Sequence, residues 1–132
     1  MRRFAAFAVL TVMLTLAACS GSSGAATSST ITLGQGQFTG TTAISVQTGT
    51  TVTFDDSAGG PHNLVTGTHG AFAAETGAPS EFGSSGLAFS GGDTKTVTFA
   101  TVGVYHITCT LHPSMQATIT VTAASAQGGG GY

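Results

Sequence analysis

The heptapeptide CTLHPSM, residues 109–115, places a thiol, an imidazole and a thioether in one short stretch of the chain. These groups belong to Cys109, His112 and Met115. Upstream, the segment GGPHN, residues 59–63, offers a second imidazole on His62. One cysteine, two histidines and one methionine form the soft three-plus-one donor set of a mononuclear copper site. We therefore predict that these four side chains bind one copper ion.

Strands separated by turns are the structure that the region around this heptapeptide predicts. Thr, Val, Gly and Ser dominate, and apolar residues alternate with polar ones, which indicates strands with one packed face and one solvated face, as in antiparallel sheets. Several such strands joined by turns predict an all-β fold, a Greek-key β-sandwich. The alternating apolar positions are Ile44, Val46, Val52, Phe54, Val97, Phe99, Tyr105, Ile107, Cys109, Ala117, Ile119 and Val121.

One stretch, residues 67–86, breaks this alternation. It is rich in Gly, Ala and Ser, and we predict a long crossing segment with one short helix near Ala71–Thr76.

The N-terminus has the pattern of an export signal. Arg2 and Arg3 precede an apolar run, residues 4–16, that is shorter than the roughly 20 residues of a membrane span. The run leads into Leu-Ala-Ala-Cys, which resembles the lipobox of bacterial lipoproteins. We predict a lipoprotein signal peptide over residues 1–18 and lipid attachment at Cys19. The alternative is an ordinary secretory signal that leaves Cys19 unmodified.

Three further segments follow from composition. Residues 19–30 are nearly all Ser, Gly, Ala and Thr, which predicts a flexible tether. Residues 31–124 are long enough for one small domain with a modest core. Residues 125–132 contain four consecutive glycines and predict a disordered tail.

Removal of the signal peptide changes the charge and cysteine counts. Lys95 becomes the only strong base against five acidic residues, so the mature chain is weakly acidic and nucleic-acid binding is not expected. With Cys19 acylated, Cys109 has no disulfide partner. Met115 is the only methionine left after residue 18. The free thiol and the single thioether therefore lie in the same heptapeptide.

The residues quoted so far resemble a known family. CTLHPSM resembles the copper loop of cupredoxins, and its C-x2-H-x2-M spacing is similar to amicyanin, whereas plastocyanins usually have two more residues before the methionine. The segments PHNLV (61–65), GTTVTF (49–54) and GVYHITC (103–109) extend the resemblance. Two features depart from it. Gln116 stands where many relatives have glycine, and residues 67–86 lack the acidic and tyrosine pattern of plant plastocyanins.

The resemblance implies an eight-stranded cupredoxin sandwich that holds one type 1 copper ion and transfers single electrons. It implies that Asn63, which follows the first histidine ligand, holds the cysteine loop by hydrogen bonds. It also implies that His112 lies at the exposed rim and offers the electron path. Outside this set, His69 and His106 are expected to be surface or packing residues, and Asp55 and Asp56 to cap or solvate a turn.

We therefore predict a blue copper electron carrier, not an enzyme. Its expected partners are redox proteins, and we expect a monomer. The predicted location is outside the cytoplasm, lipid-anchored through Cys19 or periplasmic. Three alternatives stay open: a copper carrier or storage protein, an accessory copper module of a larger redox complex, and a metal-free binding domain.

Overall fold

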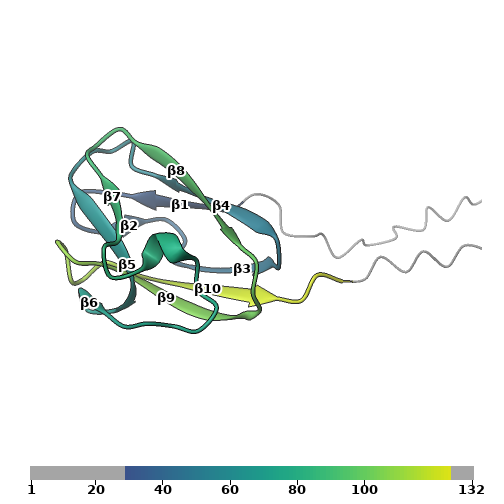
Figure 1. The fold of residues 1–132 in the computed structure, drawn as a ribbon. Coiled ribbons are helices and arrows are strands. Elements are labelled where there is room, and N and C mark those ends of the chain that lie inside the picture. The colour runs from purple at the N-terminus through teal and green to yellow at the C-terminus, as the bar shows by residue number, and fades with distance from the viewer. Residues whose placement is uncertain (1–28, 126–132) are drawn as a thin grey trace, which may run out of the picture.

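Ten strands and one short 3-10 helix form the fold of residues 29–125, the part of the chain that this computed structural model describes (Figure 1). In chain order they are β1 (Thr30–Leu33), β2 (Phe38–Thr39), β3 (Ala43–Gln47), β4 (Thr50–Asp55), β5 (His62–Thr68), β6 (Ala71–Phe72), η1 (Ser80–Phe82), β7 (Leu87–Phe89), β8 (Thr94–Phe99), β9 (Gly103–Cys109) and β10 (Gln116–Thr122).

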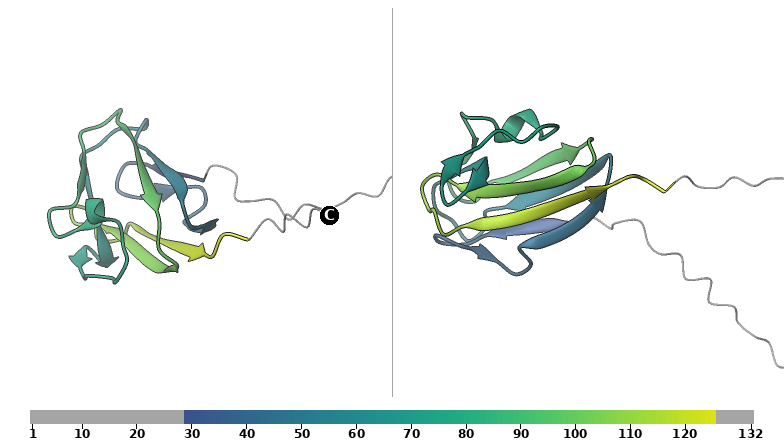
Figure 2. Two further views of the ribbon diagram at one scale, coloured as in Figure 1. Left: turned by 45° about the vertical axis from the view of Figure 1, so that its right-hand side comes forward. Right: turned by 90° about the horizontal axis from the view of Figure 1, so that it is seen from below.

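The strands form two sheets that pack face to face (Figures 1 and 2). One sheet has the order β2-β1-β4-β8, and the other has the order β3-β10-β9-β5-β6 with β7 also paired to β5. This arrangement confirms the predicted all-β sandwich. The β1–β4 and β3–β10 pairs are parallel, contrary to the antiparallel pattern that alternation suggested, and the other pairs are antiparallel. Alternation reports which face of a strand is buried, and it carries no information on strand direction.

The core lies between the two sheets and is built from the alternating positions. Eleven of the twelve apolar residues named from the sequence are buried, and the twelfth, Ile44, packs against them. They reach the interior because successive side chains of a strand point to opposite faces. The buried cluster is Ile31, Leu33, Phe38, Val46, Val52, Phe54, Leu64, Phe82, Phe89, Val97, Phe99, Tyr105, Ile107, Cys109, Met115, Ala117, Ile119 and Val121.

The short helix expected near Ala71–Thr76 is absent, and that prediction was wrong. Ala71–Phe72 instead forms β6, a short strand that folds back on β5 with Gly67 opposite Phe72. The pairing continues because the amide of Ala73 donates to the carbonyl of Thr66 (2.9 Å). Gly67 has a φ of +132°, and a Cβ added there would collide with the backbone of Ala71. Glycine permits this close backbone approach, which consumes the hydrogen-bonding groups that a helix would need.

The helix η1 belongs to the crossing segment, residues 67–86, which runs along one side of the sandwich (Figure 2). Its Phe82 is fully buried and packs against Phe54 and Phe99, with ring centroids 5.3 and 6.0 Å away. Thr66 of β5 donates a hydrogen bond to the carbonyl of Phe82 (3.3 Å). A single phenylalanine therefore ties the irregular segment to both sheets.

Several sequence predictions fall outside the described residues. They are the signal peptide (1–18), the lipid attachment at Cys19, most of the tether (19–30) and most of the tail (125–132). Within residues 29–125, no helix has the length and apolar character needed to cross a membrane. The two ends of the described chain lie at the end of the sandwich opposite the loop between β9 and β10 (Figure 1).

Candidate metal centre

Two neighbouring strands bring the first two donor side chains together. Cys109 is the last residue of β9, and His62 is the first residue of β5. The strands are antiparallel, with Leu64 opposite Cys109, so the end of one lies beside the start of the other. The amide of Asn63 also points to the Cys109 Sγ at 3.5 Å. The separation of the thiol and the first imidazole is thus fixed by sheet pairing.

The loop between β9 and β10 supplies the other two donors. The amide of Met115 donates to the carbonyl of His112 (2.9 Å), which closes the loop as a tight turn. The hydroxyl of Thr108 donates to the carbonyl of Met115 (2.9 Å) and accepts from the amide of Gly70 (2.9 Å). The β5–β6 turn therefore holds the end of the loop from outside.

Three donor atoms meet at this corner. The Cys109 Sγ lies 3.9 Å from the Nδ1 of His62 and 3.6 Å from the Nδ1 of His112, and ligand atoms of all three residues lie within 4.8 Å of one another. Metal–ligand bonds of about 2.0–2.3 Å in a trigonal plane separate their donor atoms by about 3.5–4 Å. The observed spacing therefore fits one metal ion between the three side chains. Thiolate and imidazole donors in this arrangement suit copper.

Met115 is the remaining member of the predicted ligand set. Its side chain is buried, with 1% exposed, and it belongs to the core cluster that also contains Cys109. Blue-copper sites have a thioether as their weak fourth donor, and Met115 would supply it here.

Asn63 connects β5 to the cysteine loop. Its carbonyl accepts from the amide of Thr110 (2.9 Å), and its Nδ2 donates to the Thr110 hydroxyl (3.3 Å). These are the contacts that the cupredoxin resemblance implied. Gly86, with a φ of +74°, leaves the space that the Asn63 amide occupies, since an added Cβ would collide with it. Gly86 is a part of the site that sequence reasoning missed.

The sequence matches the family of copper binding proteins described as plastocyanin/azurin over residues 25–122. This match covers more than half of the chain. The chain belongs to this family. A search of curated proteins found no match.

Solved structures of amicyanin share the fold. Amicyanin from Paracoccus versutus has a TM-score of 0.55 and 19% identity, with 76% of this chain and 86% of that chain covered. A reduced amicyanin mutant has a TM-score of 0.54 and 21% identity, with coverages of 72% and 82%. The cupredoxin fold and a single copper cofactor are thereby confirmed. Membership of this family of copper binding proteins agrees with the prediction that the chain is not an enzyme.

The two histidines of this cupredoxin site have different surroundings. His62 is 1% exposed, and desolvation by burial lowers its pKa below the ordinary 6.5. The Asp56 carboxylate and the polar backbone of Gly34 oppose that effect, and His112 adds to it. His112 is half-buried and packs on His62 with ring centroids 4.9 Å apart. One imidazole is therefore enclosed and the other reaches the surface.

Asp56 was predicted to cap or solvate a turn, and that prediction was wrong. Its side chain is fully buried, and its Oδ1 lies 3.5 Å from the Nε2 of His62. Asp55 is the residue that caps the turn, because its carboxylate accepts from the amide of Ser57 (3.0 Å). The missed signal is parity: Asp56 continues the inward alternation of Val52 and Phe54 by two residues.

The other two histidines of the described chain lie outside the site. His106 is exposed and pairs with Glu75, with 2.7 Å between its Nδ1 and the Glu75 Oε1. His69 is exposed in the β5–β6 turn, with a φ of +53°. Both placements agree with the expectation that they are surface or packing residues.

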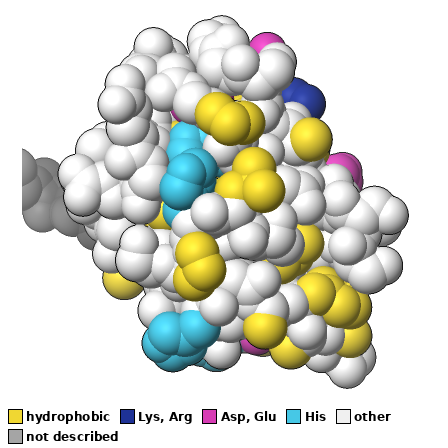
Figure 3. Space-filling model, turned by 90° about the vertical axis from the view of Figure 1, so that its left-hand side faces the viewer, with side chains coloured by type: hydrophobic (Ala, Val, Ile, Leu, Met, Phe, Trp, Pro, Cys, Tyr) yellow, Lys and Arg dark blue, Asp and Glu magenta, His cyan; other side chains and the backbone are white. Residues whose placement is uncertain are grey.

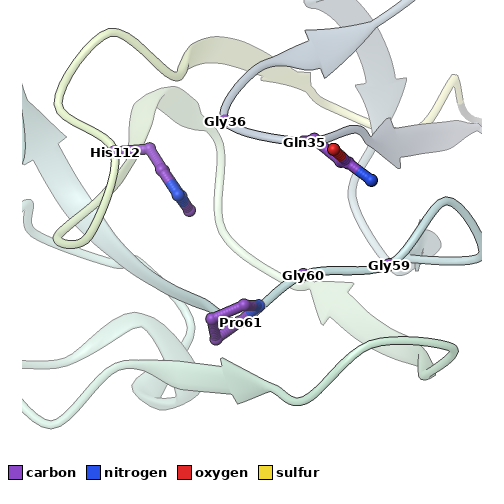
Figure 4. A pocket seen from close by; sticks show the side chains of 6 residues that line it. All are labelled: Gln35, Gly36, Gly59, Gly60, Pro61 and His112. Carbon is purple, nitrogen blue, oxygen red and sulfur yellow. The ribbon is translucent and has the colours of Figure 1, made fainter.

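A hollow of about 470 Å³ lies beside the exposed edge of His112. Its lining is short of side-chain bulk, as Figure 4 shows, and consists of Gln35, Gly36, Gly59, Gly60, Pro61 and His112. Figure 3 shows histidine side chains among hydrophobic ones on this face, with charged side chains near the margin of the view. Leu111, which is 55% exposed, is part of the apolar surface next to His112.

Proposed function

We propose that this protein is a blue copper electron-transfer protein that shuttles single electrons between redox protein partners outside the cytoplasm. The observation that carries the proposal is the cluster of His62, Cys109 and His112, whose ligand atoms lie within 4.8 Å of one another at one end of the sandwich. Met115 is the proposed fourth ligand.

Electron transfer is favoured over other copper functions because the four ligand side chains are held in fixed positions. His62 and Cys109 lie on paired strands, and hydrogen bonds from Asn63 and Thr108 hold the loop that carries His112 and Met115. Copper supplies the one-electron chemistry by alternating between Cu(II) and Cu(I). A rigid donor set gives both oxidation states similar surroundings, so little rearrangement accompanies the transfer. Because four protein donors surround the ion, no strong position is left for a substrate.

His112 is the proposed route for the electron. It is the only member of the donor set that is not fully buried, and it borders both the hollow and the exposed Leu111. A partner that docks on this apolar face would bring its own redox centre close to the imidazole. Copper held by these residues would accept one electron from the partner, which would be oxidised by one electron.

Copper titration followed by visible spectroscopy tests this proposal. We expect one equivalent of Cu(II) to give the intense thiolate-to-copper absorption and a reversible one-electron potential. Cys109→Ser should abolish the absorption, because the thiolate is its source. His106→Gln is the control, since His106 lies outside the site, and it should leave the absorption unchanged. A colourless copper-loaded protein, or rapid loss of copper on reduction, would contradict electron transfer.

We further propose that the chain is exported and anchored to a membrane by lipid at Cys19. The support is the sequence: two arginines, an apolar run over residues 4–16 and the Leu-Ala-Ala-Cys motif. Two or more acyl chains would make such an anchor stable. Cys19→Ser should move the protein from the membrane fraction to the soluble fraction with its copper site intact. Recovery of the variant in the membrane fraction would contradict the anchor.

A further inference from the structure

Asp56 is a buried acid that electron transfer alone does not account for. Its side chain is fully buried, and within the described residues neither carboxyl oxygen has a hydrogen-bond partner. A buried carboxylate without a partner is costly, because its charge is removed from water without compensation. The side chains around the Asp56 carboxyl group should therefore explain why it is buried.

The backbone around Asp56 fixes where its side chain points. Its amide donates to the carbonyl of Asp93 (2.9 Å), and its own carbonyl accepts from the amides of Gly59 (3.1 Å) and Gly92 (2.9 Å). Three main-chain hydrogen bonds therefore hold this residue at the end of β4, with its side chain on the inward face of the strand.

The group that Asp56 faces is the ring of His62. The Asp56 Oδ1 lies 3.5 Å from the Nε2 of His62, and both side chains are fully buried. On the other edge of the same ring, the Nδ1 lies 3.9 Å from the Cys109 Sγ. The Nε2 has no hydrogen-bond partner among the described residues. The two unsatisfied groups, one donor and one acceptor, therefore face each other.

We propose that Asp56 is a positioning residue for the copper site: its carboxyl group accepts the Nε2–H of His62 and holds the ring with Nδ1 directed at Cys109. A ring nitrogen that carries a proton toward a carboxylate leaves the other nitrogen free to bind metal. The 3.5 Å separation is about 0.5 Å longer than a typical N–H···O distance, so a small rotation of the ring completes the bond. This proposal deepens the proposed function and rests on copper binding by His62.

Two substitutions test the role of the carboxyl group. Asp56→Leu keeps the approximate shape and removes the acceptor, and Asp56→Asn keeps one acceptor oxygen. We expect Asp56→Leu to lower Cu(II) affinity about 10-fold to 100-fold, the usual effect of losing such a partner. Asp56→Asn should recover part of that loss. Metal-free stability in urea should stay the same or rise in Asp56→Leu, because a buried polar group that forms no hydrogen bond is replaced by an apolar one.

Asp55→Asn is the matched control. It removes the same charge one residue away, and its amide oxygen can still accept from the amide of Ser57. We expect wild-type copper affinity for this variant. A loss of Cu(II) affinity larger than the loss of Cu(I) affinity in the Asp56 variants, seen as a raised reduction potential, would further support the proposal. A purely structural carboxyl group would lower metal-free stability instead and leave the potential unchanged.

Proton NMR of the Cu(I)-loaded protein provides a test that needs no variant. We expect the Nε2–H of His62 to give a downfield resonance that exchanges slowly with water in the wild type, and to exchange faster in Asp56→Asn. Wild-type copper affinity and an unchanged Nε2–H resonance in both Asp56 variants would overturn the proposal and leave the Gly34 backbone as the acceptor. A wild type that binds no copper would overturn the proposed function as well.

Discussion

The two histidines beside Cys109 occupy similar positions in the donor cluster and very different positions in the molecule. Their Nδ1 atoms lie 3.9 and 3.6 Å from the Cys109 Sγ. His62 begins a strand, is 1% exposed and faces a buried acid, whereas His112 belongs to a loop and borders a hollow of about 470 Å³. One imidazole is fixed by the sheet, and the other is held by a loop that solvent and partners can reach. The site therefore combines a rigid side with an open side.

Replacing each histidine by glycine should reveal this difference most strongly. We expect both His62→Gly and His112→Gly to lose the visible copper absorption, because each removes one donor from the trigonal plane. Added imidazole should restore the absorption in His112→Gly, because the new gap opens into the existing hollow. In His62→Gly the cavity is enclosed by the sandwich, so the surrounding side chains must move apart before imidazole can enter.

Titration of each variant with imidazole measures the contrast. An opening cost of about 1.4 kcal/mol corresponds to a tenfold higher imidazole requirement, and we expect at least that much for His62→Gly. N-methylimidazole, which has one accessible nitrogen, is a useful control ligand for His112→Gly. Equal half-saturation concentrations for the two variants would show that the enclosed and open sides do not differ.

The sequence predicted much of both sides because the signals were local. Alternation in β4, β8, β9 and β10 identified the inward faces, and the spacing within residues 109–115 identified three of the donors. His62 was identified as the second imidazole that completes the donor set, and the segment around it also resembles a known family segment. Its meeting with Cys109 depends on the β5–β9 pairing, which no local pattern contains.

The two errors have different physical causes. The alanines near Ala71 favour a helix, yet a backbone approach at Gly67 pairs this segment with β5. Asp56 is of a residue type common in turns, yet it lies two residues after Phe54 on the inward face of the strand. Its side chain is therefore inside the sandwich, opposite His62. Gly67 and Phe72 are close in the sequence, so the first error lies in the choice between a helix and a short hairpin. The second depends on how the end of β4 lies against the start of β5, which alternation alone does not give.

A substitution at Gly86 should perturb the rigid side by a smaller amount. Gly86→Ala combines an unfavourable positive φ of about 1–2 kcal/mol with overpacking against Asn63 of about 1–3 kcal/mol. Gly40→Ala is the matched control, because its φ is +78° and an added Cβ meets nothing within 4 Å. Urea unfolding of both variants isolates the effect of the Asn63 contact. Copper affinity should fall in Gly86→Ala and not in Gly40→Ala. Equal affinities for the two variants would show that the position of Asn63 does not affect copper binding.

The smallest expected effect concerns Asp93, which is half-buried and whose carbonyl accepts the hydrogen bond of the Asp56 amide. Hydrogen bonds from the backbone and the hydroxyl of Ser90 lower the pKa of Asp93 below its ordinary 3.8. Because the folded pKa is depressed, the charged form stabilises the fold above pH 3.8, and this contribution is lost as the pH falls through the folded value.

Asp93→Asn should therefore lower metal-free stability slightly at neutral pH, and the difference from the wild type should shrink below pH 3.8. Urea unfolding at both pH values measures this, and Ser90→Ala, which removes only the hydroxyl donor, should reproduce part of the loss. Copper affinity should stay at the wild-type value, because the Asp93 backbone, not its charge, holds Asp56 toward His62. A matching fall in copper affinity would show that the rigid side depends on this surface charge as well as on main-chain hydrogen bonds.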